Sequence, residues 1–217
     1  MIDLEKIPAV VAASCLSVYW FWVIVMLVKL SRKIGKDPNA VPRELVGKLM
    51  RILWYPCIFV LVIGLWCTAV MPLRMFDGGS AKGILHGWFW EPAAWWWFVV
   101  VPASLICLVF TFVTFVCWRK MGRSWRIGID PNETLALVST GPYKYVRHPI
   151  YALRMAINIC AVVMAPTLLV AVPAGIDFIL LQIEARREEA YMEATHGEVY
   201  RQYKKSVGRF VPKAYVG

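Results

Sequence analysis

Long apolar stretches constrain this chain more than any other feature of its sequence. Three of them, Ile7 to Leu30, Ile52 to Leu73 and Ala93 to Trp118, each exceed the roughly 20 residues that a helix needs to cross a bilayer. With 59% hydrophobic residues and a mean hydropathy of +0.58, the sequence has more apolar surface than one soluble core can bury. The chain is therefore predicted to be an all-α integral membrane protein.

A fourth apolar region, Ile150 to Ile183, is long enough for two short helices. The sequence Ala165-Pro166-Thr167 interrupts it in the middle, and Pro173 is expected to break it again, because proline lacks the N–H that a helix interior uses. We therefore expect a tight helical hairpin that returns to the side from which it enters. The predicted fold has about five transmembrane helices, the last two a short hairpin, and then a cytoplasmic C-terminal helix.

Basic residues are unevenly distributed among the connecting segments. Residues 31–51 include six Lys and Arg residues, whereas residues 74–92 include only Arg74 and Lys82. Because cytoplasmic loops are enriched in Lys and Arg, the N-terminus is predicted to lie outside and the C-terminus in the cytoplasm. The basic residues lie between apolar runs, so the net charge of +10 indicates contact with anionic lipid headgroups and no nucleic-acid partner.

The chain divides into a three-helix N-terminal half, residues 1–118, and a half with the connector, hairpin and C-terminal helix, residues 119–217. The six cysteines all lie within apolar stretches, without CxxC spacing or clustered histidines. They are interpreted as small hydrophobic residues, and no metal site is expected. The sequence leaves the oligomeric state open.

The polar residues that could take part in catalysis or ligand binding follow residue 119. The segment GPYKYVRHPIY at residues 141–151 opens the hairpin, with a Gly-Pro turn, Arg147 and His148 at the membrane surface, and Pro149 in the first helical turn. Taken alone, this basic and aromatic entry to a membrane helix is explained as well by a structural role as by catalysis.

The end of the hairpin adds acids to this region. Because a hairpin brings its second end back beside its first, Glu188 and Glu189 are expected to lie near Arg147, His148 and Tyr151. The sequence therefore predicts that acids, a histidine and tyrosines converge at the cytoplasmic mouth of an apolar bundle.

The chain resembles the isoprenylcysteine carboxyl methyltransferase family and its bacterial relatives in four motifs. They occur in the order GPYKYVRHPIY, REE, HGEVYRQY and VGRFVP. The connector GRSWRIG at residues 122–128 is also similar to that of bacterial members, which implies a location in a bacterial inner membrane. The resemblance implies S-adenosylmethionine as a methyl donor from the cytoplasm and a lipophilic or small-molecule acceptor that enters from the bilayer. The sequence has no GxGxxG after a strand, so a soluble type of donor site is not expected.

The resemblance also implies roles for individual residues. Glu188 and Glu189 match an acidic pair that contributes to catalysis and to donor binding. The other residues implied in donor binding are Gly141, Tyr145, Arg147, His148, Pro149, Tyr151, Tyr200 and Tyr203.

Two positions depart from the family pattern. Leu153 stands where members commonly have glycine, and Glu184 stands where the prenylcysteine enzymes usually have arginine. An arginine suits an anionic carboxylate acceptor, whereas Glu184 favours an amine or a thiol, because a carboxylate attracts an ammonium or accepts a proton. Glu184 is therefore a candidate catalytic residue. The acceptor stays open among a prenylcysteine-like carboxylate, an amine-bearing phospholipid headgroup and a thiol.

Arg154 is an unexpected charge within an apolar helix. It shares a helix face with Tyr151 and Asn158, and ionisable residues at membrane depth usually face the protein and have a partner. Asp177 on the returning helix is the expected partner. Two interpretations stay open, a buried ion pair that locks the hairpin and a catalytic cation that receives the acceptor's anionic head.

Two other functions compete with a methyltransferase. Membrane sterol reductases have a related hairpin, an RHP-type motif and a tyrosine-rich tail, and would bind NADPH in the corresponding place. The GPY turn and the Glu188-Glu189 pair favour the methyltransferase. The other alternative is a non-catalytic lipid-binding protein that keeps the bundle without turnover.

Overall fold

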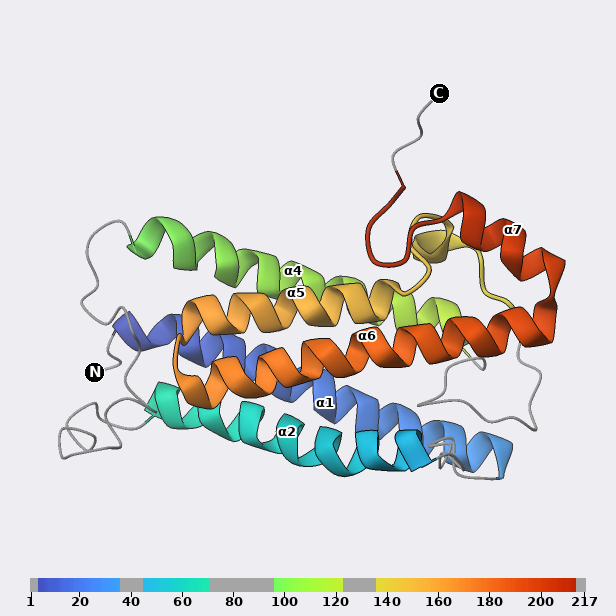
Figure 1. Cartoon of the computed structure of the whole chain (residues 1–217). Coiled ribbons are helices and arrows are strands. Elements are labelled where there is room, and N and C mark those ends of the chain that lie inside the picture. The colour runs from blue at the N-terminus through green and yellow to red at the C-terminus, as the bar shows by residue number, and fades with distance from the viewer. Residues whose placement is uncertain (1–3, 36–44, 71–95, 123–135, 214–217) are drawn as a thin grey trace.

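The computed structural model describes residues 4–35, 45–70, 96–122 and 136–213. Five long helices make up most of this part of the chain (Figure 1): α1 (Ile7–Ile34), α2 (Leu45–Val70), α4 (Trp97–Met121), α5 (Pro149–Met164) and α6 (Leu168–His196). Three short helices complete it: η1 (Leu4–Lys6), η6 (Gly141–Lys144) and α7 (Glu198–Ser206). The predicted all-helical fold is confirmed. Residues 74–92 and 123–128, used above for orientation and for the connector, lie outside the described residues.

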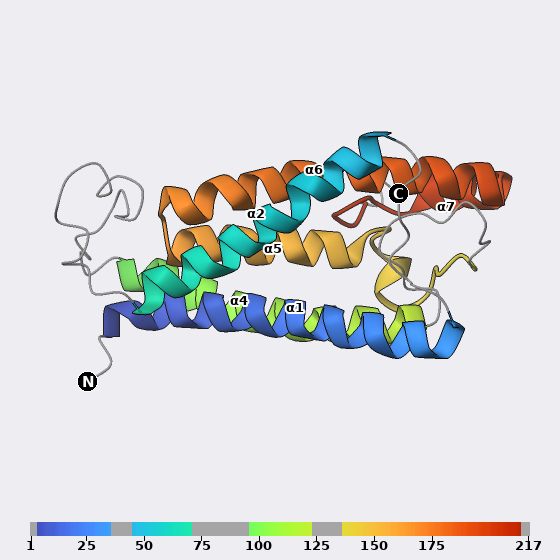
Figure 2. The same ribbon diagram turned by 90° about the horizontal axis from the view of Figure 1, so that it is seen from below.

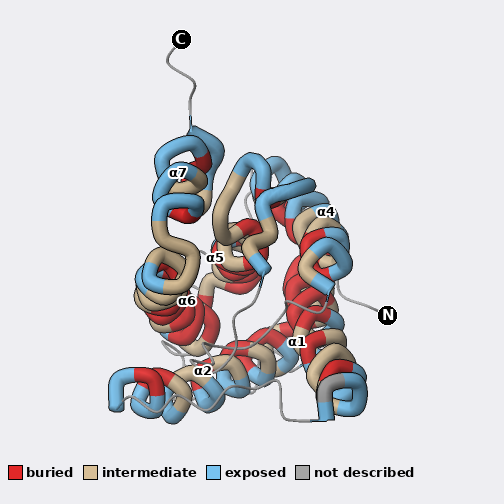
Figure 3. Tube along the Cα trace, turned by 90° about the vertical axis from the view of Figure 1, so that its right-hand side faces the viewer, coloured by how far each residue is buried: buried red, intermediate tan, exposed pale blue. Residues whose placement is uncertain are grey.

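The helices have the length and the surface of a membrane bundle. Among the described residues, four helices, α1 with η1, α2, α4 and α6, are long and apolar enough to cross a bilayer. The 16 residues of α5 rise only about 24 Å, less than the ~30 Å hydrocarbon core. Viewed along the bundle, the outward faces are mostly exposed and the inward faces mostly buried (Figure 3). Large apolar side chains on those outward faces, such as Phe59, Phe98 and Phe112, suit contact with lipid, so the chain is an integral membrane protein.

Helix α5 lies at the centre of the arrangement. It packs against α1, α4 and α6, while α2 lies across α1 and α6 (Figure 2). One apolar cluster, which includes Leu16, Leu65 and Ile157, fills the interior toward the α5–α6 turn. A second, around Tyr19 and Trp118, fills it toward the start of α5. The N-terminus of α5 is therefore held within the bundle by packing on several sides.

The α5–α6 hairpin turns at residues 165–167, as predicted, but Pro173 does not break it. Pro173 lies inside α6, so that expectation was wrong. Proline removes a single backbone hydrogen bond here, the one that Leu169 O would accept. Close packing offsets this loss, because Gly64 of α2 lies against Leu169 and the Cys57 thiol donates to Pro173 O at 3.1 Å. Helix α6 thus continues from the membrane through the acidic segment to His196.

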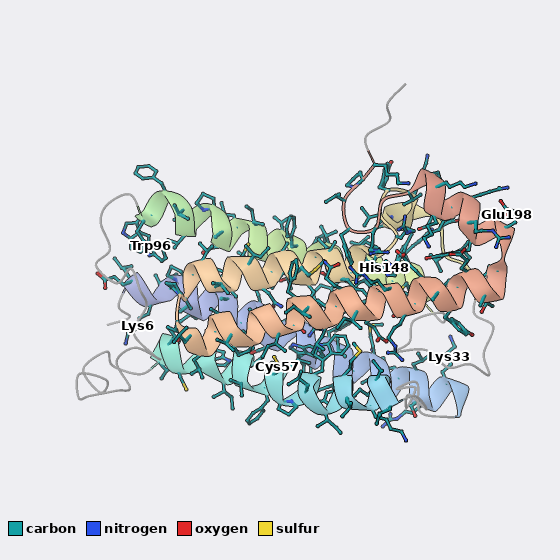
Figure 4. The ribbon with its side chains drawn as sticks, in the orientation of Figure 1. Lys6, Lys33, Cys57, Trp96, His148 and Glu198 are labelled. Atoms are coloured by element: carbon teal, nitrogen blue, oxygen red, sulfur yellow. The ribbon has the colours of Figure 1, made fainter. Side chains whose placement is uncertain are left out.

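Basic residues gather at one end of the bundle. This end holds the last turn of α1, the first turns of α2 and the last turn of α4, with Arg32, Lys33, Lys48, Arg51, Arg119 and Lys120. In Figure 4, Lys33 lies at the same end as His148 and Glu198, whereas Lys6 and Trp96 lie at the other. The basic end is therefore also the end where the hairpin begins and finishes.

The contact between Gly64 and Leu169 generates a test of the α2–α6 packing. A Cβ at Gly64 would lie 2.9 Å from Leu169 Cγ and 3.0 Å from Leu169 O, so Gly64→Ala forces the helices apart. We expect a loss of about 1–3 kcal/mol in the free energy of unfolding, seen as a lower melting temperature in detergent. Gly175→Ala, in the same pair of helices, has open space for its Cβ and should cause no such loss. Equal effects of the two substitutions would contradict the close packing.

Candidate functional site

Three segments meet at the basic end and form the candidate site: residues 141–151, the last turns of α6, and the tail after α7. The tail runs beside the start of α5, where Arg147 N donates to Gly208 O at 2.8 Å and His148 N donates to Arg209 O at 3.0 Å. The backbone at Gly208 comes so close to Val211 O that a Cβ would overlap it. These contacts hold side by side two segments that are far apart in the sequence.

The turn between α6 and α7 makes this return possible. Gly197 ends α6 with a φ of +55°, a conformation that other residues rarely adopt. Helix α7 then turns back, and Tyr203 OH donates to Tyr143 O at 2.6 Å. Tyr200 is buried beside Tyr203, with 6.0 Å between the ring centroids. The tyrosine-rich segment therefore anchors the tail on the η6 turn.

Glu189 holds the three segments together. Its Oε1 accepts from Arg147 Nη2 at 2.9 Å and from Arg209 Nε at 2.9 Å, and its Oε2 accepts from Arg209 Nη2 at 2.7 Å. Arg147 also donates from Nη1 to the backbone carbonyls of Lys204, at 3.0 Å, and Val207. Guanidinium groups engage both carboxylate oxygens of Glu189, and because its side chain is only 2% exposed, these oxygens are closed to solvent. This residue is a positioning residue for α5, α6 and the tail.

Glu188, its neighbour, is in a different environment. Its side chain is 25% exposed, Tyr151 OH donates to its Oε1, and its Oε2 lies 3.4 Å from His148 Nδ1. The His148 ring stacks on Tyr151 with centroids 5.5 Å apart and planes 5° apart, and Phe210 lies 6.0 Å away. A partly open carboxylate beside aromatic faces suits the binding of an organic cation.

Two buried polar atoms at the site have no hydrogen-bond partner among the described residues. They are Tyr143 OH and His148 Nε2, the latter 3.4 Å from Glu189 Oε1 but without hydrogen-bond geometry. A buried polar group without a partner costs about 1–3 kcal/mol, so such atoms usually mark a place where a ligand or water binds. The site therefore combines an anionic group, aromatic rings and unused polar atoms.

Burial and the neighbouring acids set the protonation states here. Burial lowers the pKa of His148, but Glu188 and Glu189 outweigh this and raise its pKa above 6.5. Burial raises the pKa of Tyr203 to about 12, and it also raises the pKa values of Tyr143 and Tyr200. The tyrosines are therefore neutral hydrogen-bonding groups near pH 7.

The structure confirms most of the predicted proximities. It brings Arg147, His148 and Tyr151 together with the acidic pair, and Pro149 is buried in the first turn of α5. Gly141 has a φ of +63° at the start of η6. Tyr145 is 61% exposed. Its side chain is therefore outside this cluster.

The two remaining predicted residues lie further into the bundle. Glu184 is buried one turn before Glu188, and Arg187 Nη1 donates to it at 2.5 Å. The predicted pair of Arg154 and Asp177 is also confirmed. Neither residue has a contact with Glu189 in the described structure.

Sequence reasoning missed the role of Arg209, the second guanidinium on Glu189. The motif VGRFVP included it, but a single arginine in an irregular tail has no periodicity that predicts its partner. Phe210 and the unpaired hydroxyl of Tyr143 were missed for the same reason. The one available signal was a single arginine between Gly208 and Phe210, downstream of the acidic segment of α6.

Comparisons with known proteins give two findings. The sequence profile of the isoprenylcysteine carboxyl methyltransferase (ICMT) family matches residues 102–194, which includes α5 and most of α6. The chain is also similar to the methanethiol S-methyltransferase of Pseudomonas sp. strain GM41, with 31% identity over 161 residues. This match covers 72% of the chain and 56% of that protein, so the chain spans about half the length of the curated relative it matches.

Removal of the charge on Glu189 tests its place in the fold. Glu189→Gln leaves Arg147 and Arg209 without their common anion, and breaking a buried ion pair typically costs about 3–5 kcal/mol. We expect a clear drop in the melting temperature in detergent. Glu198→Gln removes an exposed pair with Arg201 on α7 and should leave the melting temperature unchanged. A Glu189→Gln protein as stable as the wild type would contradict the assignment.

His148 gives the site a pH dependence with a definite sign. Because the folded-state pKa is raised, protonated His148 stabilises the fold fully below pH 6.5, and this contribution is lost as the pH rises through the folded pKa. The melting temperature should therefore fall as the pH rises above about 6.5, and His148→Gln should reduce the slope. An unchanged slope in His148→Gln would show that the decline comes from other groups.

Proposed function

We propose that this chain is an S-adenosylmethionine-dependent methyltransferase of the isoprenylcysteine carboxyl methyltransferase family and that it acts on a small apolar thiol. The observation that carries the proposal is the partly open Glu188 carboxylate, which contacts Tyr151 and His148 at the basic end of the bundle, where Phe210 lies beside the His148 ring. The name of the Pseudomonas relative, methanethiol S-methyltransferase, supports a thiol as the acceptor.

The residues of the site fit the methyl donor. S-adenosylmethionine has a sulfonium, an ammonium and a carboxylate, and when bound it supplies an electrophilic methyl group. Glu188 and the rings of Tyr151 and Phe210 suit the cationic groups. Tyr143 OH and His148 Nε2 offer hydrogen bonds to polar atoms of the donor. The charge of Arg147 is engaged by Glu189, so this residue positions the site.

A thiol acceptor accounts for the absence of a cation at position 184. Methyl transfer to a thiol forms an S–C bond, breaks the S–CH3 bond of the donor and releases the thiol proton. An anionic carboxylate acceptor needs a cation, whereas a thiol needs a base. Glu184 is buried and acidic, so the site suits an acceptor that arrives neutral.

We assign Glu188 as the base. Both oxygens of Glu189 are held by arginines, whereas Glu188 is partly exposed and accepts one hydrogen bond from Tyr151. The phenol of Tyr151 orients the carboxylate, and His148 on its other side compensates the negative charge. The tail at residues 207–210 covers this cluster, which limits access of water that would compete with the acceptor.

The orientation in the membrane follows from the charges. Lys and Arg residues at the ends of α1 and α4 and at the start of α2 lie on the same side as the site. Under the positive-inside rule this side faces the cytoplasm, where the donor is available. A small apolar thiol dissolves in the bilayer and can reach the site from the membrane side. We propose that this bilayer is a bacterial inner membrane.

Binding and turnover by purified protein in detergent test the proposal. Calorimetric titration should show binding of S-adenosylmethionine and none of NADPH, which a sterol-type reductase would bind. With methanethiol, mass spectrometry of the headspace should detect dimethyl sulfide, the acceptor plus one methyl group. Absence of donor binding would remove the methyltransferase assignment, and donor binding without thiol methylation would remove the thiol.

The assignment of the base predicts different outcomes for neighbouring acids. Glu188→Gln keeps the shape of the side chain and removes the base, so kcat should fall about 100-fold or more, with a smaller loss of melting temperature than Glu189→Gln causes. Glu193→Gln, on the same helix, should keep the wild-type kcat, because Glu193 pairs with Lys204 away from the cluster. A Glu188→Gln enzyme with wild-type kcat would show that another group takes the proton.

A further inference from the structure

Further into the membrane than the site, one polar layer joins four helices. We call it the Arg154 layer; it consists of Arg154 and Asn158 of α5, Asp177 of α6, Trp54 of α2 and Trp20 of α1. Asp177 Oδ1 accepts hydrogen bonds from Arg154 and from Trp54 Nε1, the latter at 2.5 Å. Asp177 Oδ2 accepts a hydrogen bond from Asn158 Nδ2 at 2.7 Å. The Arg154 guanidinium lies over the rings of Trp20, 4.5 Å from its centroid, and Trp54, 5.3 Å from its centroid.

Stability alone is a poor explanation for this layer. Arg154, Asn158 and Asp177 are 6%, 2% and 0% exposed, and a buried ion pair often stabilises a protein no better than apolar residues of the same size. Ionisable residues within a membrane usually have a function. None of these five residues has a role in donor binding or proton removal as proposed above.

The position of the layer relative to the site suggests that function. Arg154 is one turn after Tyr151 on α5, and Asn158 is two turns after it, about 10 Å along the helix. On α6, Asp177 precedes Glu188 by 11 residues, about 16 Å. An alkyl chain that extends from the Tyr151–Glu188 contact into the bundle therefore meets Arg154 first, after roughly four methylene groups, and reaches the level of Asn158 after roughly eight.

The chemistry of the layer opposes passage of such a chain. Two tryptophan rings occupy the space around the guanidinium, and a chain that displaced them would lie against a buried ion pair without water. Asn158 Oδ1, buried and without a hydrogen-bond partner among the described residues, adds another polar atom to this surface. Only an acceptor that ends above the layer avoids these contacts.

We propose that the Arg154 layer is the floor of the acceptor site and limits the enzyme to thiols with short alkyl chains. This inference rests on the proposed thiol methyltransferase function and specifies its substrate class. Trp20 and Trp54 are specificity-determining residues in this account, and the ion pair between Arg154 and Asp177 holds their rings in place from the protein side.

The experiment measures kcat/KM for a series of linear thiols from methanethiol to octanethiol. The wild type should methylate the shortest thiols and lose activity steeply along the series. Trp54→Ala opens the layer from α2 and should raise the ratio of kcat/KM for hexanethiol to that for methanethiol at least about tenfold. Trp20→Ala opens the layer from α1, leaves the Trp54–Asp177 hydrogen bond intact and should change the ratio in the same direction.

Two control variants separate the floor from general effects. Trp66→Ala removes a tryptophan from the same helix, three turns away, where it bonds to Ser17, and should leave the ratio unchanged. Trp54→Phe keeps an aromatic ring at the layer and should stay close to the wild type. Melting temperatures in detergent show that each variant is folded.

The outcomes distinguish the inference from the function on which it rests. If the wild type methylates thiols but both folded alanine variants keep the wild-type ratio of kcat/KM values, the Arg154 layer is not the floor of the acceptor site. The proposed methyltransferase function is unaffected by that result. The floor is also overturned if Trp66→Ala changes the ratio as much as Trp54→Ala does, or if the wild type methylates octanethiol as well as methanethiol. A wild type that methylates no thiol overturns the proposed function and the inference with it.

Discussion

The structure of the site depends on one buried carboxylate held between two guanidinium groups. Glu189 accepts from Arg147, which stands before α5, and from Arg209, which lies in the tail. Because the three residues come from separate segments, this interaction determines where the tail lies relative to the bundle. The backbone hydrogen bonds from Arg147 and His148 to the tail, and the tilted contact between the rings of His148 and Phe210, follow from that placement.

Helical geometry gives two adjacent acids different roles. Successive side chains on a helix point about 100° apart, so Glu189 faces the two arginines while Glu188 faces Tyr151 and His148. One carboxylate is closed and structural, and the other is partly open and available for chemistry. The division lets a single helix both fix the site and, in the proposed mechanism, supply its base. It also explains why α6 continues beyond the membrane.

The apolar frame and the meeting of the hairpin ends could be predicted from the sequence. Lengths of apolar runs predict helices because the bilayer sets the length, and a hairpin brings Tyr151 near Glu188 by its topology alone. Arg154 and Asp177 could be paired because charges at membrane depth need partners. Each of these predictions relies on a regular period or on a strong physical constraint.

The errors arose where neither condition holds. Pro173 was expected to break α6, but the loss of one hydrogen bond is small beside the packing of α2 on this turn. Arg209 and Phe210 lie in an irregular tail whose path depends on a glycine turn and on distant partners, so local pattern does not predict their contacts. Tyr145 follows a short 3-10 turn, where spacing does not define an inward face; it is exposed, and its role in donor binding stays a prediction.

Hydrogen–deuterium exchange with and without S-adenosylmethionine tests the central claim most directly, namely that the donor binds where the tail meets the start of α5. The account predicts that the donor slows exchange in two peptides, around residues 143–151 and 200–210, and leaves the membrane part of α4 unchanged. These peptides contain Tyr143, Tyr151 and Phe210, which would enclose the donor. Binding of the donor without slower exchange in either peptide would contradict the account, because the donor would then bind elsewhere.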